Sequence, residues 1–241
     1  MEDEIEINLN SKYAQTSINN TYIFDIGAIL VPIQSHIHVK VKNCVFPHSF
    51  YNVNASNNYI IFIANGLTYT YIMDYGNYNA IDITKYFTSN IPNMSCTYSS
   101  KTNKFTFTHS LYEFTFSTNA TCLEMFGSPS YRRTSTDKKL TSEYSINMSP
   151  IQSIIINTDY NTGNILSVDP KLKSSLCVIP VNSQPNSLMF YENFHPTVSN
   201  LYVNNLNNIT LRITDQDNKA IEFNGRNWNI TLILEIIDFV N

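Results

Sequence analysis

The chain has 241 residues and a formal net charge of −4, and only 14% of its residues are charged. An acidic balance argues against direct nucleic-acid binding, because the neutralisation of phosphates needs a basic surface. No apolar run approaches the roughly 18 residues that a membrane-spanning helix requires, so we expect no membrane span.

The N-terminal segment 1–20 is polar and acidic and begins with MEDEIEINLN. It lacks the apolar region of a secretory signal, and we expect it to be a flexible arm that is dispensable for folding. Residues 21–241 are expected to form a single domain, because β-sandwiches often reach this length as one unit. The four cysteines have no CxxC spacing, and we expect free thiols made in a reducing compartment.

The first clear strand covers 36–46, where apolar and polar residues alternate as they do in a strand with one buried face. The alternation slips at Asn43, which predicts a β-bulge. Pro47 is expected to end the strand, because proline has no backbone N–H to donate within a sheet.

Two hairpins and a helix are predicted next. Asn65-Gly66 joins two apolar runs and favours a tight turn. The runs 94–99 and 104–109 flank the polar tetrapeptide SKTN and predict a second hairpin. The segment 80–87 has apolar residues at helical spacing.

Asp82 is a candidate N-cap for that helix. A single helical turn is predicted over 121–126.

Later strands are predicted at 151–157, 175–181 and 187–191, with a short helix near 198–203. Strands at intervals of roughly ten residues, separated by Pro and Asn/Gly, are typical of sandwiches and jelly rolls. We therefore predict an all-β, mainly antiparallel jelly-roll β-sandwich with a few short helices.

The C-terminal segment 207–241 carries the clearest pattern. Apolar and polar residues alternate over 209–214, the polar residues 215–218 turn the chain, and an apolar run covers 230–234. We interpret this segment as one hairpin. Trp228 is in phase with the apolar positions of the last strand and is expected to face the interior, where its indole N–H needs an acceptor.

Two histidines are the first candidates for chemistry. His36 and His38 lie on the same face of a predicted strand, as two metal ligands would. A third ligand would have to come from His48 or His109, which are distant in the sequence. The alternative is a solvated strand face, which we favour, and we expect no metal and no cofactor.

The other motifs nominate no catalytic residue. Asp215-x-Asp217 begins like a calcium-binding loop, but Ala220 and Arg226 occupy the positions that need Gly and Glu. A turn is the better interpretation. Glycine-rich nucleotide-binding motifs and the GxSxG nucleophile motif are missing from the sequence, so we expect no enzymatic activity and no catalytic site residues.

Aromatic and basic segments each have two interpretations. The aromatic residues of 69–71 and 105–107 would either stack against sugars or bases or pack in the core, and we favour the core. The basic loop 131–139 is either a solvated loop or a contact for an acidic neighbouring surface.

Two segments carry a family resemblance. The first is FPHSFYN at 46–52, directly after a strand, and the second is DQDNKAIEFNGRNWNITL at 215–232. With the order of the features after residue 20, they make the chain similar to the minor capsid, or penton, proteins of virophages and Polinton-like viruses.

The resemblance implies a structural virion protein with a jelly-roll fold and no catalysis. It also implies a homopentamer that fills the fivefold vertices of an icosahedral capsid and contacts the major capsid protein. The expected location is the virion capsid, after synthesis and assembly inside the host cell.

Two other classes remain open. A receptor- or glycan-binding viral fibre or lectin-like jelly roll would expose Tyr, Asn and Asp side chains in its loops and would often be a trimer. A cupin-like metalloenzyme would need a third ligand beside His36 and His38. The mass of the native oligomer and the metal content separate these classes from a penton.

Overall fold

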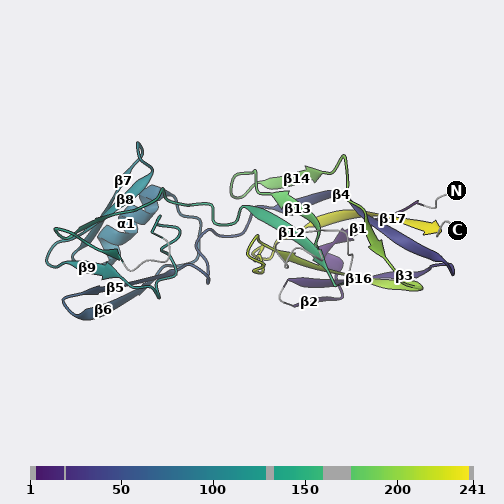
Figure 1. Ribbon diagram of the computed structural model, residues 1–241, viewed down its shortest axis with the longest axis horizontal. Helices are drawn as coiled ribbons and strands as arrows, with labels where there is room; N and C mark the ends of the chain where they lie inside the picture. The colour runs from purple at the N-terminus through teal and green to yellow at the C-terminus, as the bar shows by residue number, and fades with distance from the viewer. Residues whose placement is uncertain (1–3, 19, 129–132, 160–174, 239–241) are drawn as a thin grey trace. The chain divides into compact units, whose positions relative to one another are not determined.

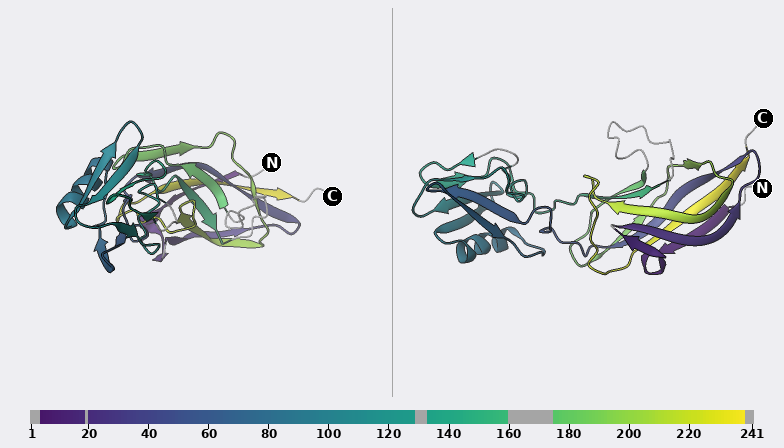
Figure 2. Two further views of the ribbon diagram at one scale, coloured as in Figure 1. Left: turned by 60° about the vertical axis from the view of Figure 1, so that its left-hand side comes forward. Right: turned by 90° about the horizontal axis from the view of Figure 1, so that it is seen from below.

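The computed structural model describes residues 4–18, 20–128, 133–159 and 175–238, and three views of it are shown (Figures 1 and 2). The chain divides into two compact units. Unit 1 comprises residues 1–50 and 151–241, and unit 2 comprises residues 51–150. This division differs from the single domain expected over 21–241, because strand spacing along a sequence does not tell which strands share a core.

Unit 1 contains eleven elements in the described residues. They are β1 (Glu4–Asn10), the 3₁₀ helix η1 (Ser11–Tyr13), β2 (Thr16–Ile18), β3 (Thr21–Leu30), β4 (Ser35–Pro47), β12 (Ser153–Thr158), β13 (Ser175–Pro180), β14 (Leu188–Glu192), β15 (Ser199–Leu201), β16 (Asn205–Thr214) and β17 (Asn229–Asp238). β15 lies where the sequence predicted a helix over 198–203, and that prediction was wrong.

These strands form two antiparallel sheets. The first has the order β1-β17-β4-β14, with β15 also paired to β4, and the second has the order β13-β12-β16-β3-β2. Successive long strands change sheet repeatedly, as the ribbon shows (Figure 2). One cluster of buried apolar side chains contains residues from both sheets. This is the topology of a jelly roll, so the predicted fold class is confirmed.

The C-terminal segment is not a hairpin. β16 pairs with β3 and β12 in the second sheet, whereas β17 pairs with β4 and β1 in the first. The turn at 215–219 exists, since the Asp215 and Lys219 backbones hydrogen bond across it. The remaining residues up to Trp228 then carry the chain from one sheet to the other. Alternation showed that both segments are strands, but it does not identify a strand's partner.

The predicted bulge and the end of β4 are both confirmed. Thr231 of β17 is paired with Asn43, and the next residue, Leu232, is paired with Val41, so one residue of β4 is left over. β4 ends at Pro47. The bulge keeps Val41 and Cys44 on the buried face although they are three residues apart.

The N-terminal segment is part of the sandwich rather than a flexible arm. Residues 4–10 form β1, which is paired over its full length with β17, and Leu9 is 4% exposed. The prediction of a flexible arm was wrong because the acidic residues Glu4 and Glu6 occupy the exposed positions of this strand, while its core-facing positions are apolar.

Leu9→Ala should therefore lower the free energy of unfolding by about 2–5 kcal/mol, as for other leucines removed from a packed core. Lys101→Ala, at an exposed position away from β1, is the control and should stay within about 0.5 kcal/mol of the wild type. Chemical denaturation followed by circular dichroism measures both. Deleting residues 1–20 should lower the melting temperature strongly, and an unchanged melting temperature would show that β1 is dispensable.

Trp228 lies at the centre of the core of unit 1, as predicted. Its side chain is 0% exposed, and its ring centroid is 4.7 Å from that of Tyr22, 5.7 Å from Phe46 and 6.0 Å from Phe24. Among the described residues no acceptor lies within hydrogen-bond distance of the indole Nε1 atom, so the expected acceptor is not found there. Packing between the two sheets, rather than a polar contact, therefore holds this ring.

Trp228→Ala should reduce the free energy of unfolding by about 3–5 kcal/mol. Trp228→Phe should cost less, because a ring remains and the unsatisfied N–H is removed. Equilibrium unfolding in urea, followed by far-UV circular dichroism, compares the two. An alanine variant with the same denaturation midpoint as the wild type would contradict the central position of this side chain.

Unit 2 contains eight elements in the described residues. They are β5 (Tyr59–Ala64), β6 (Leu67–Ile72), α1 (Ala80–Asn90), β7 (Met94–Ser99), β8 (Lys104–His109), β9 (Phe114–Phe116), β10 (Arg133–Thr134) and β11 (Lys139–Thr141). They form two sheets with the orders β10-β9-β5-β6 and β11-β8-β7. A second apolar cluster, separate from that of unit 1, contains many phenylalanines: Phe62, Phe87, Phe105, Phe107, Phe114, Phe116 and Phe126.

The local predictions in unit 2 hold with one change. Asn65 and Gly66 have φ angles of 49° and 74°, and they connect Ala64 to its partner Leu67 as a two-residue turn. The helix is capped by Asn79 rather than Asp82. Asp82 completes a capping box by accepting the Asn79 N–H. The single helical turn predicted over 121–126 is confirmed, since the Phe126 N–H donates to the Cys122 carbonyl oxygen four residues earlier.

The two ends of unit 2 are joined by one side chain. The Asn52 amide donates to the carbonyl oxygens of Tyr78, at 2.7 Å, and Met148, at 3.0 Å, and its oxygen accepts the Tyr78 N–H. The beginning and the end of the inserted segment are therefore held together by unit 2 itself.

A fragment of residues 51–150 should fold alone, because it has its own apolar core and its first and last residues are held together by hydrogen bonds of Asn52. A fragment that starts at Asn54 lacks the Asn52 amide and should melt at a lower temperature. Thermal melts followed by circular dichroism compare the two fragments. A random-coil spectrum for residues 51–150 would show that unit 2 depends on unit 1 to fold.

No helix in the described part of the chain is both long and apolar enough to cross a membrane.

Candidate functional site

The two candidate metal ligands lie on the face of β4 opposite Ile37 and Val39. His36 is only 9% exposed there, so the favoured interpretation as a solvated strand face was wrong for this residue. The His38 Nδ1 atom is 3.8 Å from one carboxylate oxygen of Glu235, and Lys40 donates to the other. His36 stacks on Tyr202, with ring centroids 5.3 Å apart. In the described residues no group of three His, Cys, Asp or Glu side chains is placed to hold a metal ion.

The other two histidines considered as ligands have their own partners. His48 Nδ1 lies 2.9 Å from the Ser183 carbonyl oxygen, which only accepts, so this nitrogen carries the proton. Burial lowers the pKa of His48, and the hydrogen bond to Ser183 opposes that shift. His109 accepts two backbone N–H groups of its own loop. His48 and His109 thus have separate environments, whereas the rings of His36 and His38 lie 4.8 Å apart.

The aspartate motif forms a closed turn. One carboxylate oxygen of Asp215 accepts the N–H groups of Asp217, at 2.9 Å, and Lys219, at 2.8 Å. Burial raises the pKa of Asp215, and these two hydrogen bonds oppose the increase. The carboxylate therefore supports its own turn, in agreement with the interpretation of the motif as a turn.

The aromatic strands pack in the core as we favoured. Phe105 and Phe107 are fully buried. Tyr69 and Tyr71 stack on Phe62, with ring centroids 5.2 Å and 6.2 Å apart. These rings therefore contribute to the core of unit 2.

The basic loop 131–139 lies only partly within the described residues, since 129–132 are outside them. Within the described part, Glu113 accepts the Lys138 N–H and the Ser135 hydroxyl. These two hydrogen bonds, with that of Ser135 the stronger cause, lower the pKa of the Glu113 carboxyl. An acidic side chain of the same unit thus already lies against this loop.

All four cysteines are free and buried, as expected. They are Cys44, Cys96, Cys122 and Cys177. Burial raises the pKa of each thiol, that of Cys96 to about 12. Protonated, buried thiols are poor nucleophiles.

An apolar edge strand is the most distinctive surface of unit 1. β14 is at one edge of the first sheet, where it pairs with β4. Met189 faces the core, but Leu188 and Phe190 are 69% and 63% exposed, and nearby Phe194 is 77% exposed. We call Leu188, Phe190 and Phe194 the β14 surface. A hydrophobic edge strand is a template for association with another chain.

The opposite edge of the same sandwich also exposes apolar side chains. β1 and β2 are the edge strands there, and η1 connects them. Tyr13 is 73% exposed and Ile18 67%. The Lys12 ammonium lies over the Tyr13 ring at 5.5 Å from its centroid. We call Lys12, Tyr13 and Ile18 the β1–β2 surface.

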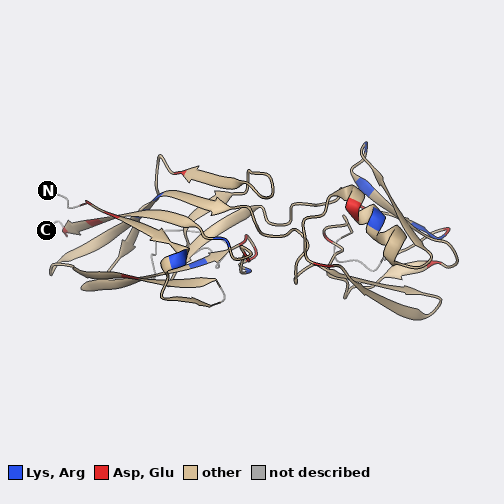
Figure 3. Cartoon of the chain, turned by 180° about the vertical axis from the view of Figure 1, so that it is seen from behind, with Lys and Arg blue, Asp and Glu red and all other residues tan. Residues whose placement is uncertain are grey.

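Most of the ribbon carries neither sign of charge (Figure 3). An exposed Glu192 ends β14, and Lys12 belongs to the β1–β2 surface. Glu192 and Lys12 have opposite charges, although β1 also exposes Glu4 and Glu6.

A polar groove of about 440 Å³ lies beside the β1–β2 surface. Serine, asparagine, arginine and glutamate side chains line it, together with Tyr22 and Phe223. Both rings are buried, at 9% and 3% exposure. The groove therefore presents polar groups without an open aromatic face on which a sugar ring would stack.

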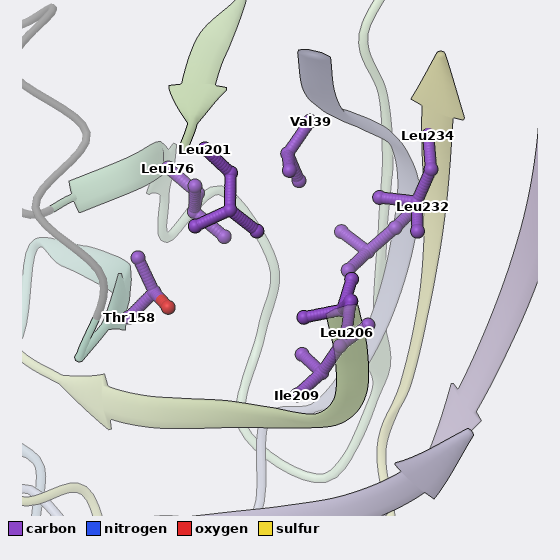
Figure 4. A pocket seen from close by; sticks show the side chains of 8 residues that line it. All are labelled: Val39, Thr158, Leu176, Leu201, Leu206, Ile209, Leu232 and Leu234. Carbon is purple, nitrogen blue, oxygen red and sulfur yellow. The ribbon is translucent and has the colours of Figure 1, made fainter. Parts of the chain in front are cut away.

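Between the two sheets is a small apolar cavity. Figure 4 shows side chains from both sheets pointing into it, among them Leu206, Leu232 and Thr158. Its volume is about 20 Å³, which is room for roughly one water molecule. Ligand pockets are usually about 300–1,000 Å³, so this space is a gap in core packing.

The sequence did not indicate the two apolar surfaces. The segment LMFYE reads as a strand that is apolar on both faces, which is equally typical of a buried strand. Only the position of β14 at the edge of the sheet exposes Leu188 and Phe190.

The sequence matches no protein-family profile, and no curated protein sequence matches it. The fold is similar to that of the mavirus penton protein in its crystal structure, with a TM-score of 0.51 and 13% sequence identity over 98% of this chain and 100% of that one. A chain in the cryo-EM structure of the Sputnik virophage matches with a TM-score of 0.46 and 12% identity over 96% of this chain and 97% of that one. The similarity to the mavirus penton protein confirms the resemblance at the level of the fold.

Proposed function

We propose that the chain is a structural capsid protein of a virus, of the penton type, and that five copies form a ring at each fivefold vertex of the shell. The observation that carries this proposal is the extent of the similarity to the mavirus penton protein, which covers 98% of the chain. A match of this extent includes unit 2, residues 51–150, as well as the jelly roll. The same proposal places the protein in the virion, assembled inside the host cell.

The surface of unit 1 supports ring formation. A closed ring needs one heterologous contact, in which one surface of a copy meets a different surface of the next copy. The β14 surface and the β1–β2 surface lie at opposite edges of one sandwich, and both expose large apolar side chains. Glu192 beside the first and Lys12 in the second have opposite charges. We propose that the β14 surface of one copy binds the β1–β2 surface of the next.

The ring would contact the major capsid protein through surfaces that the subunit contact leaves free. We assign no catalysis to this role. The buried thiols and the self-contained turn of Asp215 support a structural role, because these groups already serve the fold.

The native mass of the full chain tests the ring. We expect a mass of five 27.6 kDa chains by mass photometry or light scattering. Phe190→Lys should give folded monomers, because a buried unpaired charge is costly in an apolar contact. Ile33→Lys is the matched control, since Ile33 is 94% exposed and belongs to neither surface; it should remain a pentamer.

The direction of the contact has its own test. Ile18→Lys should also give monomers. A mixture of the Phe190→Lys and Ile18→Lys proteins should form heterodimers and no rings, because only one intact pair of surfaces remains. A trimeric wild type that binds glycans would favour the fibre or lectin class, and a monomeric wild type would contradict the penton proposal.

A further inference from the structure

The last residue of β8 supports a turn through its imidazole ring. His109 is 4% exposed, and its Nδ1 atom lies 3.2 Å from the Leu111 nitrogen and 3.0 Å from the Tyr112 nitrogen, whose N–H groups it accepts. A backbone N–H only donates, so Nδ1 has no proton and the ring is neutral with its proton on Nε2. The imidazole thus has the role that Asp or Asn usually has in a turn.

The surroundings of the ring favour this neutral state. The rings of Tyr112, Phe114 and Phe62 lie 5.8 Å, 6.4 Å and 6.4 Å from it. Burial lowers the pKa of His109 below its ordinary value of 6.5, and the positive charge of Lys138 lowers it further. The loop that contains Lys138 is held close, because the His109 N–H donates to the Lys138 carbonyl oxygen at 3.0 Å.

The acidic group nearest in sequence is engaged elsewhere. The Glu113 carboxylate accepts the Ser135 hydroxyl and the Lys138 N–H, and its hydrogen bonds are with these groups rather than with the imidazole. A proton added to Nδ1 would therefore face two N–H groups, and both hydrogen bonds to the turn would be lost.

The turn lies at a defined place in unit 2. The segment 110–113 leads into β9, where Phe114 is paired with Ala64, next to the Asn65-Gly66 turn. β5 begins at Tyr59, close to where the chain enters unit 2, so its far end is the end opposite the insertion point. Leu111 and Tyr112 are 51% and 42% exposed there.

We propose that His109 is a pH-sensitive switch, whose protonation releases the 110–113 turn and rearranges the apolar surface formed by Leu111 and Tyr112 at the end of unit 2 opposite the insertion. The turn is formed at pH 7, where the ring is neutral. It is lost as the pH falls through the lowered pKa of His109. The unfolded chain binds this proton more readily than the folded one, so the stability of unit 2 also falls with pH below about 6.5.

Amide hydrogen exchange of the full chain tests the switch. Protection factors, corrected for the intrinsic effect of pH, are measured for the Leu111 and Tyr112 amides between pH 7.5 and 4.5. We expect a fall of roughly tenfold or more through one transition with its midpoint below 6.5, because a net hydrogen bond contributes about that much. The Met73 amide is the internal control. It donates to the Asn58 carbonyl oxygen at the other end of the β5–β6 hairpin, and its protection factor should change little with pH.

Two variants complete the test. His109→Asn keeps an acceptor for the two N–H groups but does not titrate, so both amides should stay protected at every pH. His109→Ala should leave them unprotected even at pH 7.5, and if it does not fold, the asparagine comparison decides alone. A wild type that is equally protected at pH 7.5 and 4.5, or a His109→Asn protein with the same transition as the wild type, would overturn the proposal. Neither result depends on the oligomeric state or on the proposed capsid role.

Discussion

The pairing of β17 with both β1 and β4 is the constraint on which unit 1 depends. Through it the two ends of the described chain lie side by side in one sheet, with Glu4 opposite Glu235 and Asn10 opposite Asn229. β17 occupies the position between the N-terminal edge strand and β4, so the first sheet is complete only when the last strand is in place. Trp228, directly before β17, then fills the space between the sheets.

This closure explains how unit 1 holds an insertion of 100 residues. The strands before and after unit 2, β4 and β12, belong to different sheets that pack on one core. Unit 2 closes its own ends through Asn52 and has its own aromatic core. Because long insertions in a surface connection cost little additional closure entropy, the jelly roll keeps its topology while a second domain is attached to it.

The low content of charged residues and the exposed apolar edge strands both favour association with other copies of the chain. A protein with only 14% charged residues has few of the charges that normally protect edge strands from association. The β14 surface and the β1–β2 surface are such edges, and a ring of identical copies would cover both. In unit 2 the conformation of the exposed apolar turn at 110–113 is held by two hydrogen bonds to the His109 ring.

The sequence by itself determined the local structure and the fold class. Asn65-Gly66 needs the positive φ angles of a two-residue turn, the slip at Asn43 marks the bulge, and the phase of Trp228 predicts its burial. These properties depend on residues close together in the chain. The tertiary structure alone decided that β16 and β17 belong to different sheets, that residues 4–10 are a strand, and that unit 2 is separate.

The same division applies to the candidate sites. That the Asp215 motif forms a turn could be predicted from the chain, because its hydrogen bonds are to residues two and four positions away. The exposure of Phe190 could not, since an apolar strand has the same sequence at the centre of a sheet as at its edge. His109 also accepts local N–H groups, but its response to pH depends on burial and on Lys138, which only the folded chain brings close to the ring.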